Sequence, residues 1–224
     1  PQIFENDGAS RFTERILSVS DQDAQMLAMS TGFFLEDSNH DGLQDLVFFS
    51  AEFIAVSLNR EAFEFGPLQQ VYAESGDAPG LPISAVQADW DQDGDLDLFL
   101  PSLDPFSLGK IYEVGRLGSS DRLLERRGRR YVLHQELESS TGAGIAMVGL
   151  ASDRDRDGDL DLLVPSLRGA FGMSPTAFYS NPGSGDSEAV WTEDAKALSA
   201  NLALSGMGAD SLDLNQDGHW DYCI

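Results

Sequence analysis

Cysteine is nearly absent from this 224-residue sequence, because Cys223 stands alone. A single cysteine rules out an intrachain disulfide and does not decide the redox compartment. We expect Cys223 to be a small buried strand residue, with an intermolecular disulfide as the less favoured alternative. The sequence also lacks a run of about 18 apolar residues, so it predicts no membrane-spanning helix. Residues 1–8 are polar and acidic, unlike a secretory signal.

Basic residues are scarce as well. The chain has 14 Lys and Arg against 38 Asp and Glu, which gives a net charge of −24. Such a charge argues against nucleic acid or an anionic membrane as a partner. Sixteen of the acidic residues lie in four short segments described below. Four bound Ca²⁺ ions would bring the charge to about −16, which gives much of the acidity a local purpose.

Catalytic motifs are missing too. The three histidines are dispersed, and the sequence contains no Gly-x-Ser-x-Gly, no His-Glu-x-x-His and no phosphate-cradling glycine loop. His40 and His219 lie inside the acidic segments, and His134 is expected in an outer strand. We therefore expect no enzymatic activity from these residues.

What the chain does have is a repeat. Four segments align without gaps to the pattern D-x-[DN]-x-D-G-x-x-D, each followed by an apolar stretch. They begin 52, 64 and 60 residues apart, and are named here loop 1 (37–45), loop 2 (89–97), loop 3 (153–161) and loop 4 (213–221). Positions 1 to 9 count from the first Asp of each loop.

The pattern of each loop is that of a calcium site. Ca²⁺ prefers six to eight hard oxygen ligands, and alternating Asp side chains converge only if the chain curls tightly. Glycine at position 6 permits that curl, and all four copies have it: Gly42, Gly94, Gly158 and Gly218. An EF-hand is excluded, because its position 12 is a bidentate Glu, whereas here it is apolar: Phe48, Leu100, Val164 and Ile224. Thrombospondin-type calcium repeats are excluded because they need regularly spaced cysteines.

Between the loops, the sequence predicts β-hairpins. Residues 3–8 leading to 12–14, and 178–183 leading to 191–193, each join two aromatic or aliphatic strands by an Asn/Gly turn. Residues 56–60 leading to Phe63 are a degraded copy, and 104–137 hold an enlarged connection. Helical periodicity is weak throughout, and 193–204 is its best candidate. Four strands in a unit of about 60 residues indicate the blade of an all-β β-propeller.

The loop followed directly by a strand resembles the FG-GAP/VCBS repeats of integrin-α-like β-propellers. Gly206-Met-Gly208 ahead of loop 4 and the hairpin Phe178-Tyr-Ser-Asn-Pro-Gly183 look most like the bacterial VCBS and ASPIC/UnbV-type branch. The Gly-Ala-Pro tail of FG-GAP is replaced by Leu100-Pro-Ser102 and Val164-Pro-Ser166. This departure weakens the integrin comparison more than the calcium assignment.

The resemblance implies ligands at positions 1, 3, 5 and 9 through side chains and at position 7 through its carbonyl. We expect the chain to bind up to four Ca²⁺ ions, one in each loop. Since loops 2 and 3 have the most carboxylates, we expect them to bind more tightly than loops 1 and 4. The implied metal ligands are Asp37, Asn39, Asp41, Leu43 and Asp45; Asp89, Asp91, Asp93, Asp95 and Asp97; Asp153, Asp155, Asp157, Asp159 and Asp161; and Asp213, Asn215, Asp217, His219 and Asp221.

The resemblance also implies four-stranded antiparallel blades with the calcium loop between the first two strands. The expected units are a hairpin half-blade (1–20), three blades (21–80, 81–142 and 143–204) and the start of a further blade (205–224). Propellers of this family commonly have about seven blades, so we expect a partial propeller. Completion by another chain or a missing segment is favoured over ring closure by the first hairpin.

The implied role is that of an extracellular, periplasmic or cell-surface binding, adhesion or scaffold module, in which Ca²⁺ is structural and the ligand is a protein or a carbohydrate. The alternative is a calcium-dependent propeller enzyme of the polysaccharide lyase kind. Seven of the 14 basic residues fall between Lys110 and Arg130, where we expect an exposed hairpin tip. The sequence leaves the burial of Trp90 open and predicts that Trp191 packs between blades.

Overall fold

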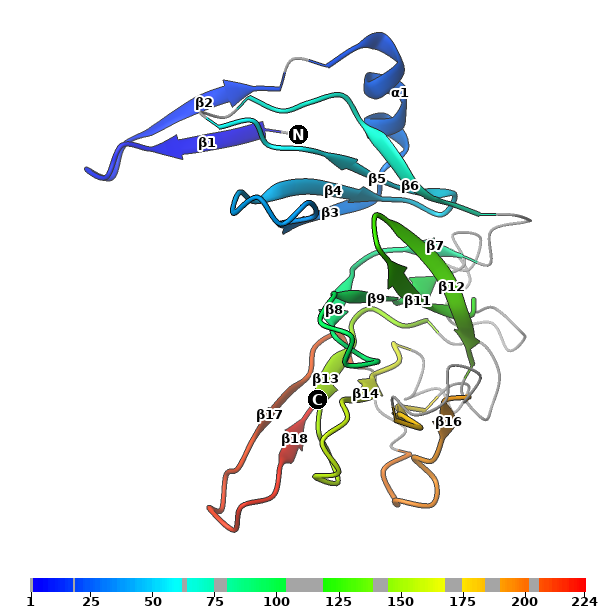
Figure 1. The fold of residues 1–224 in the computed structure, drawn as a ribbon. Helices are drawn as coiled ribbons and strands as arrows, with labels where there is room; N and C mark the ends of the chain where they lie inside the picture. Colours follow the sequence, from blue (N-terminus) through cyan, green and yellow to red (C-terminus); the bar gives the residue numbers. More distant parts are fainter. Residues whose placement is uncertain are drawn as a thin grey trace. The chain divides into compact units, whose positions relative to one another are not determined.

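A computed structural model describes residues 2–17, 19–61, 64–74, 80–103, 119–138, 145–167, 175–183, 190–201 and 206–224. The chain divides into two compact units, Pro1–Glu74 and Ser75–Ile224, which are called unit 1 and unit 2 and described separately. Both are built from antiparallel sheets, as the sequence predicts (Figure 1). None of the helices in the described part of the chain is long and apolar enough to cross a membrane.

Unit 1 starts with an exposed hairpin of β1 (Gln2–Asn6) and β2 (Phe12–Ile16), which pair antiparallel from Gln2 opposite Ile16 to Asn6 opposite Phe12. Its turn is closed by the amide of Asp7, which donates to the carbonyl of Arg11 at 3.1 Å. This is the hairpin that the Asn/Gly turn predicts.

A helix that the sequence analysis missed follows the hairpin. Helix α1 (Asp21–Met29) begins at Ser20, whose side chain accepts the amide N–H of Asp23 at 3.1 Å. Acidic Asp21 and Asp23 in the first turn favour the positive end of the helix dipole. The predicted helix at 193–204 is wrong: residues 192–193 are strand and 195–199 form a turn, while 202–205 lie outside the described residues.

The main sheet of unit 1 is a meander of β3 (Gly32–Glu36), β4 (Asp45–Phe49), β5 (Phe53–Ser57) and β6 (Gln69–Ala73), in that order. Its two central strands are buried along their whole length, which their unbroken apolar sequence explains. Gly32 is required at the sheet edge, because a Cβ there would lie 2.3 Å from the Phe49 ring. Phe63 lies outside the described residues.

Unit 2 contains two further four-stranded meanders. The first has β8 (Val86–Ala88), β9 (Asp97–Leu100), β11 (Asp121–Arg127) and β12 (Arg130–Leu137). The second has β13 (Leu150–Ser152), β14 (Asp161–Val164), β15 (Ala177–Ser180) and β16 (Thr192–Glu193). Two short pairs complete unit 2: β7 (Leu81–Pro82) with β10 (Ser102–Leu103), and β17 (Asp210–Leu212) with β18 (Asp221–Cys223).

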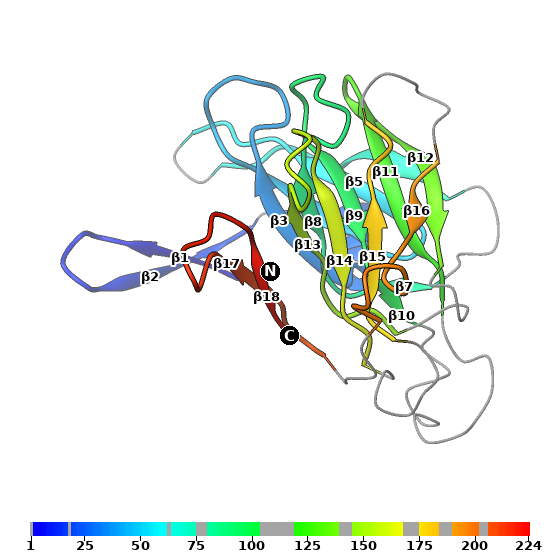
Figure 2. The same cartoon turned by 90° about the horizontal axis from the view of Figure 1, so that it is seen from below.

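The two meanders of unit 2 pack face to face, as Figure 2 shows. Phe99 of one sheet and Leu162 of the other belong to the same buried cluster. Trp90 and Trp191 meet within it edge to face, with ring centroids 5.4 Å apart, and both are buried. The prediction that Trp191 packs between blades is therefore confirmed, and Trp90 is its partner.

The β17–β18 pair packs on the outer side of the second meander. Tyr222 stacks edge to face on Phe178 at 5.2 Å, and its hydroxyl lies 2.8 Å from that of Ser152. Cys223 on β18 is exposed, so the prediction of a buried cysteine is wrong. Among the described residues β18 pairs only with β17, so its other edge is not paired with any described strand.

The fold class predicted from the sequence is confirmed, since the structure is all-β and contains three antiparallel four-stranded sheets, each consistent with a propeller blade. The described residues form no closed ring of sheets, and the number of blades and the unit boundaries stay predictions.

Candidate metal centres

Each acidic loop joins the first two strands of its sheet, as predicted. Loop 1 connects β3 to β4, loop 2 connects β8 to β9, loop 3 connects β13 to β14, and loop 4 connects β17 to β18. The glycine at position 6 has a positive φ in every copy, between 87° and 98°. Position 4 is also left-handed in every copy, with φ between 58° and 65° at His40, Gln92, Arg156 and Gln216. Two left-handed residues per loop curl the chain tightly.

The Asp at position 9 anchors each loop to its sheet. One oxygen accepts the backbone N–H of position 2, at 2.9–3.3 Å in all four loops. In loops 1 to 3 the other oxygen accepts the backbone N–H of a residue within two positions of the end of the third strand. These are Asn59 to Asp45 at 2.8 Å, Arg126 to Asp97 at 2.7 Å and Asn181 to Asp161 at 3.0 Å. Position 9 therefore holds three segments of chain together.

Burial of these anchoring carboxyl groups raises their pKa values. The pKa of Asp97 rises to about 7, because its desolvation outweighs the two backbone N–H groups that favour the anion. Burial also raises the pKa of Asp45 and of Asp161, and at Asp161 the charge of Arg154 opposes the increase. A nearby cation would favour the ionised form of each group.

Loops 2 and 3 bring three carboxylates together. Oxygens of Asp89, Asp91 and Asp97 in loop 2 lie within 4.8 Å of one another, and so do those of Asp153, Asp155 and Asp157 in loop 3. Either group could hold a metal ion.

The position-1 carboxylate differs between the two pairs of loops. In loop 1, Asp37 accepts the N–H groups of Asp41 and Gly42 at 3.0 and 2.8 Å, and Asp213 does the same in loop 4. In loops 2 and 3, Oδ1 of Asp89 and Oδ1 of Asp153 are buried without a hydrogen-bond partner in the described part of the chain. A buried carboxylate oxygen without a partner is costly, and a bound cation would remove that cost.

The remaining predicted ligands lie at the exposed rim of the loops. At position 5, Asp41, Asp93, Asp157 and Asp217 each accept the amide of position 7, at 2.8–2.9 Å. In loops 1 and 4 the amide groups of Asn39 and Asn215 donate to the position-5 carboxylates at 2.8 and 2.9 Å. The position-7 residues are thereby tied to position 5 through their backbone N–H groups, and they are Leu43, Asp95, Asp159 and His219.

Loops 2 and 3 also touch each other. The side-chain amide of Gln92, at position 4 of loop 2, donates to the carbonyl of Gly158 at 3.0 Å and to the carboxylate of Asp159. The buried amide of Asn181 donates to the carbonyls of Trp90 at 2.9 Å and Leu160 at 3.2 Å. The contacts of Gln92 and the contact of Asn181 with Trp90 run from one blade to the next, and no motif in the sequence predicts them.

The basic residues between Lys110 and Arg130 are only partly exposed. The β11–β12 turn at Gly128 is a hairpin tip, and Arg127, Arg129 and Arg130 are exposed on it, as predicted. Arg122 and Arg126 are buried, with exposed fractions of 0% and 4%, so the prediction of exposure is wrong for them. Arg126 packs over the ring of Tyr131 at 5.5 Å. Residues 110–118 lie outside the described residues.

Together, antiparallel four-stranded sheets with an Asp-rich loop between the first two strands define a repeat protein with propeller-type blades. Residues 37–100 match the family model of the FG-GAP-like repeat, and this span includes loops 1 and 2. This part of the chain therefore carries an FG-GAP-like repeat, and its four-stranded sheets are consistent with β-propeller blades. The comparison gives no support for a special closeness to the VCBS or ASPIC/UnbV-type branch.

Two other comparisons were made. No curated protein matches the chain. Among solved structures, the chain is similar to a lectin from Agrocybe aegerita, described as specifically recognising non-reducing terminal N-acetylglucosamine. The identity is 15%, the TM-score is 0.37, and the alignment covers 96% of this chain and 66% of the lectin chain. The chain thus spans just under two thirds of the length of that structure.

Proposed function

We propose that this chain is a calcium-binding module of an extracellular or cell-surface protein, in which Ca²⁺ stabilises the rim of the blades and the blades bind a protein or carbohydrate ligand. The observation that carries the proposal is the pair of three-carboxylate groups in loops 2 and 3, each with a buried position-1 oxygen that no described group hydrogen-bonds. The predicted side-chain ligands are those at positions 1, 3, 5 and 9.

The chemistry of these donors fits Ca²⁺ better than other common cations. All are carboxylate, amide or carbonyl oxygens, whereas zinc sites use Cys and His. The loops combine carboxylates with backbone carbonyls and stay open to solvent at their rim, which suits the seven or eight ligands that Ca²⁺ accepts. Mg²⁺ demands a near-ideal octahedron and keeps most of its water.

The location follows from the same chemistry. Extracellular calcium modules typically have dissociation constants of about 10⁻⁴–10⁻³ M, and such sites fill outside cells. Rim sites that are open to solvent belong in this range. Since no described constellation resembles a catalytic one, we propose binding rather than catalysis. A screen on acidic polysaccharides, with and without chelator, tests the enzymatic alternative: calcium-dependent cleavage would overturn this part of the proposal.

The test is thermal unfolding with Ca²⁺, with Mg²⁺ and with excess chelator. A site filled at about ten times its dissociation constant stabilises the folded state by about 1.4 kcal/mol. We expect the midpoint to rise in Ca²⁺ and much less in Mg²⁺. A variant with Asn in place of Asp89, Asp91, Asp153 and Asp155 should lose most of the increase. Equal midpoints in Ca²⁺ and chelator would refute the proposal.

A further inference from the structure

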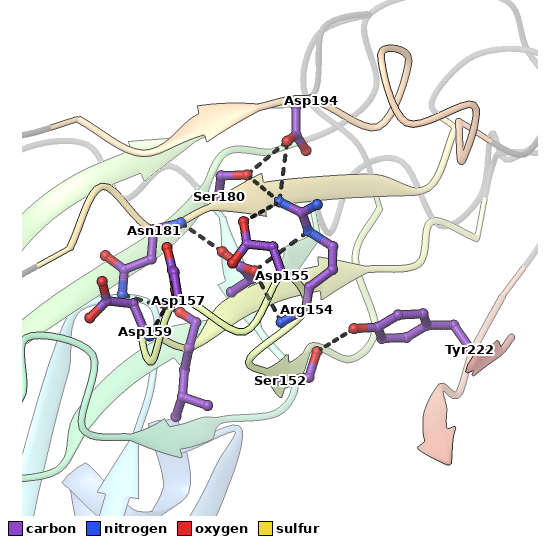
Figure 3. A network of polar contacts seen from close by, with 11 residues as sticks. Ser152, Arg154, Asp155, Asp157, Asp159, Ser180, Asn181, Asp194 and Tyr222 are labelled. Atoms are coloured by element: carbon purple, nitrogen blue, oxygen red, sulfur yellow. Dashed lines mark hydrogen bonds and ion pairs between the residues drawn. The ribbon is translucent and has the colours of Figure 1, made fainter. Parts of the chain in front are cut away.

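Loop 3 contains a cation of its own. Position 2 of the four loops is occupied by Ser38, Trp90, Arg154 and Leu214, so only loop 3 has a charged side chain there. The guanidinium of Arg154 does not extend into solvent, since its side chain is 17% exposed. It lies inside a group of polar side chains from the loop and from the neighbouring strands (Figure 3).

Two of the carboxylates that surround Arg154 are predicted calcium ligands. Its Nη2 lies 3.4 Å from Oδ2 of Asp155 at position 3, and its Nε lies 3.5 Å from Oδ2 of Asp161 at position 9. Asp161 at the same time accepts the backbone N–H groups of Arg154 and Asn181. One arginine thus bridges both ends of the metal-binding loop.

Other contacts hold the guanidinium in place. Nη2 of Arg154 donates to the hydroxyl of Ser180 on β15 at 2.8 Å and lies 3.4 Å from Oδ2 of Asp194, which follows β16. Ser180 in turn donates to the same oxygen of Asp194 at 2.7 Å. Figure 3 shows these groups converging on the arginine from the outer strands of the blade. Arg154 therefore keeps two partners even if a metal takes the loop carboxylates.

Loop 2 provides the contrast. Its position 2 is Trp90, whose ring is buried against Trp191 and adds no charge. The three-carboxylate group of loop 2 includes its position-9 residue, Asp97, whereas that of loop 3 does not include Asp161. The position-9 carboxylate is thus directed towards the metal group in the loop without an arginine, and towards Arg154 in the loop that has one.

We propose that Arg154 is a built-in counter-cation of loop 3, which competes with Ca²⁺ for Asp155 and Asp161 and makes loop 3 a weaker calcium site than loop 2. This inference rests on the proposed function. It revises the equal ranking of loops 2 and 3 that their carboxylate content suggests. It also gives Arg154 opposite effects in two conditions: it stabilises the loop without calcium and opposes calcium binding.

The experiment isolates loop 3 by replacing the position-1 residues of the other loops, Asp37, Asp89 and Asp213, with Asn. Calcium binding to this parent is compared with that of Arg154→Gln in the same background. We expect Arg154→Gln to bind Ca²⁺ about tenfold more tightly. In chelator its unfolding midpoint should be lower than that of the parent, because three carboxylates lose their counter-cation. In saturating Ca²⁺ the difference should shrink or reverse.

Arg156→Gln is the matched control. It removes the same charge from the same loop, at position 4, where loops 2 and 4 already have Gln. We expect no more than about a twofold change in the calcium affinity of loop 3, because salt screens the charge of an exposed arginine from the bound ion. An equal gain in both variants would overturn the proposal, because it would show a general charge effect. Unchanged or weaker binding by Arg154→Gln would also overturn it, since Arg154 would then position the ligands.

Two further outcomes are distinguishable. If Arg154→Gln does not fold, Arg154→Lys keeps the charge without the planar fork, and it should bind Ca²⁺ more tightly than the parent but less than tenfold; no gain refutes the proposal. If the wild-type chain binds no Ca²⁺ at all, the proposed function fails. If the wild type binds Ca²⁺ and the loop 3 parent does not, Arg154→Gln should create binding, and its failure to do so refutes the role of Arg154.

Discussion

Replacing Asp97 with alanine tests whether position 9 stabilises the fold even when no calcium is bound. Asp97 is 2% exposed, and its two oxygens accept the backbone N–H groups of Trp90 and Arg126 at 3.0 and 2.7 Å. Alanine would leave both buried N–H groups without an acceptor. Each orphaned donor costs about 1–3 kcal/mol, so we expect a loss of about 2–6 kcal/mol.

The measurement is thermal or denaturant unfolding in excess chelator, where calcium cannot contribute. For a chain of this size, 1 kcal/mol corresponds to about 2–4 °C in the midpoint. The loss should therefore be plain, on the order of 4–24 °C. Asp97→Asn should fall between, because its amide oxygen can keep one of the two N–H groups.

The control is Asp93→Ala at position 5 of the same loop. Asp93 is exposed, and its carboxylate accepts the amide N–H of Asp95 at 2.8 Å within the same loop. In chelator, we expect Asp93→Ala to cost less than about 0.5 kcal/mol, as for other exposed substitutions; in Ca²⁺ it should lose part of the calcium-dependent increase. The reasoning is refuted if Asp97→Ala matches the wild type in chelator and differs only in Ca²⁺, because position 9 would then be a ligand alone.

Three further predictions concern unit 2. Burial raises the pKa of Asp121 from 3.8 to about 8, so between these values the folded state holds a proton that the unfolded state has lost. The free energy of unfolding should therefore fall as pH rises from about 4 to 8. In denaturant curves measured across this pH range, Asp121→Asn should show a shallower fall. Asn181→Ala removes the side-chain amide that donates to the carbonyls of Trp90 and Leu160. It should lower the free energy of unfolding by about 1–3 kcal/mol, and a change below about 0.5 kcal/mol would contradict the role of the contact with Trp90 in the neighbouring blade. Gly149→Ala places a Cβ 2.8 Å from the Phe99 ring and should cost about 1–3 kcal/mol, whereas Gly208→Ala, with no atom within 4 Å, should be neutral within about 0.5 kcal/mol.

Local features of the fold were predictable because their signals are local. The glycine at position 6 has the positive φ that the repeat demands, and the predicted hairpin strands are present as β15 and β16, which pair antiparallel. Helix α1 has a readable start in Ser20 followed by Asp23, a pattern typical of an N-terminal cap. Its apolar periodicity is weak, however, so the hydrophobic pattern does not reveal the helix.

Contacts between distant residues were not predictable in the same way. The backbone N–H that meets Asp97 comes from Arg126, 29 residues further along the chain, and any residue except proline can supply one. Arg122 and Arg126 are buried because β11 is covered along most of its length, including its first four residues, and the charged residues of this segment do not predict that burial. The left-handed backbone at position 4 is not predicted by residue type, since this position is His, Gln or Arg.

The anchoring role of position 9 has a consequence for how such repeats can change over time. Because Asp45, Asp97 and Asp161 tie their loops to the backbone through hydrogen bonds within the protein, closing the blade depends on position 9 and does not require the carboxylates at positions 1, 3 and 5. Positions 1, 3 and 5 are then free to drift, as the Asn residues of loops 1 and 4 illustrate, while the blade keeps its shape. A metal requirement can be gained, relaxed or lost one loop at a time, and a propeller can adjust its demand for calcium without inventing a new fold.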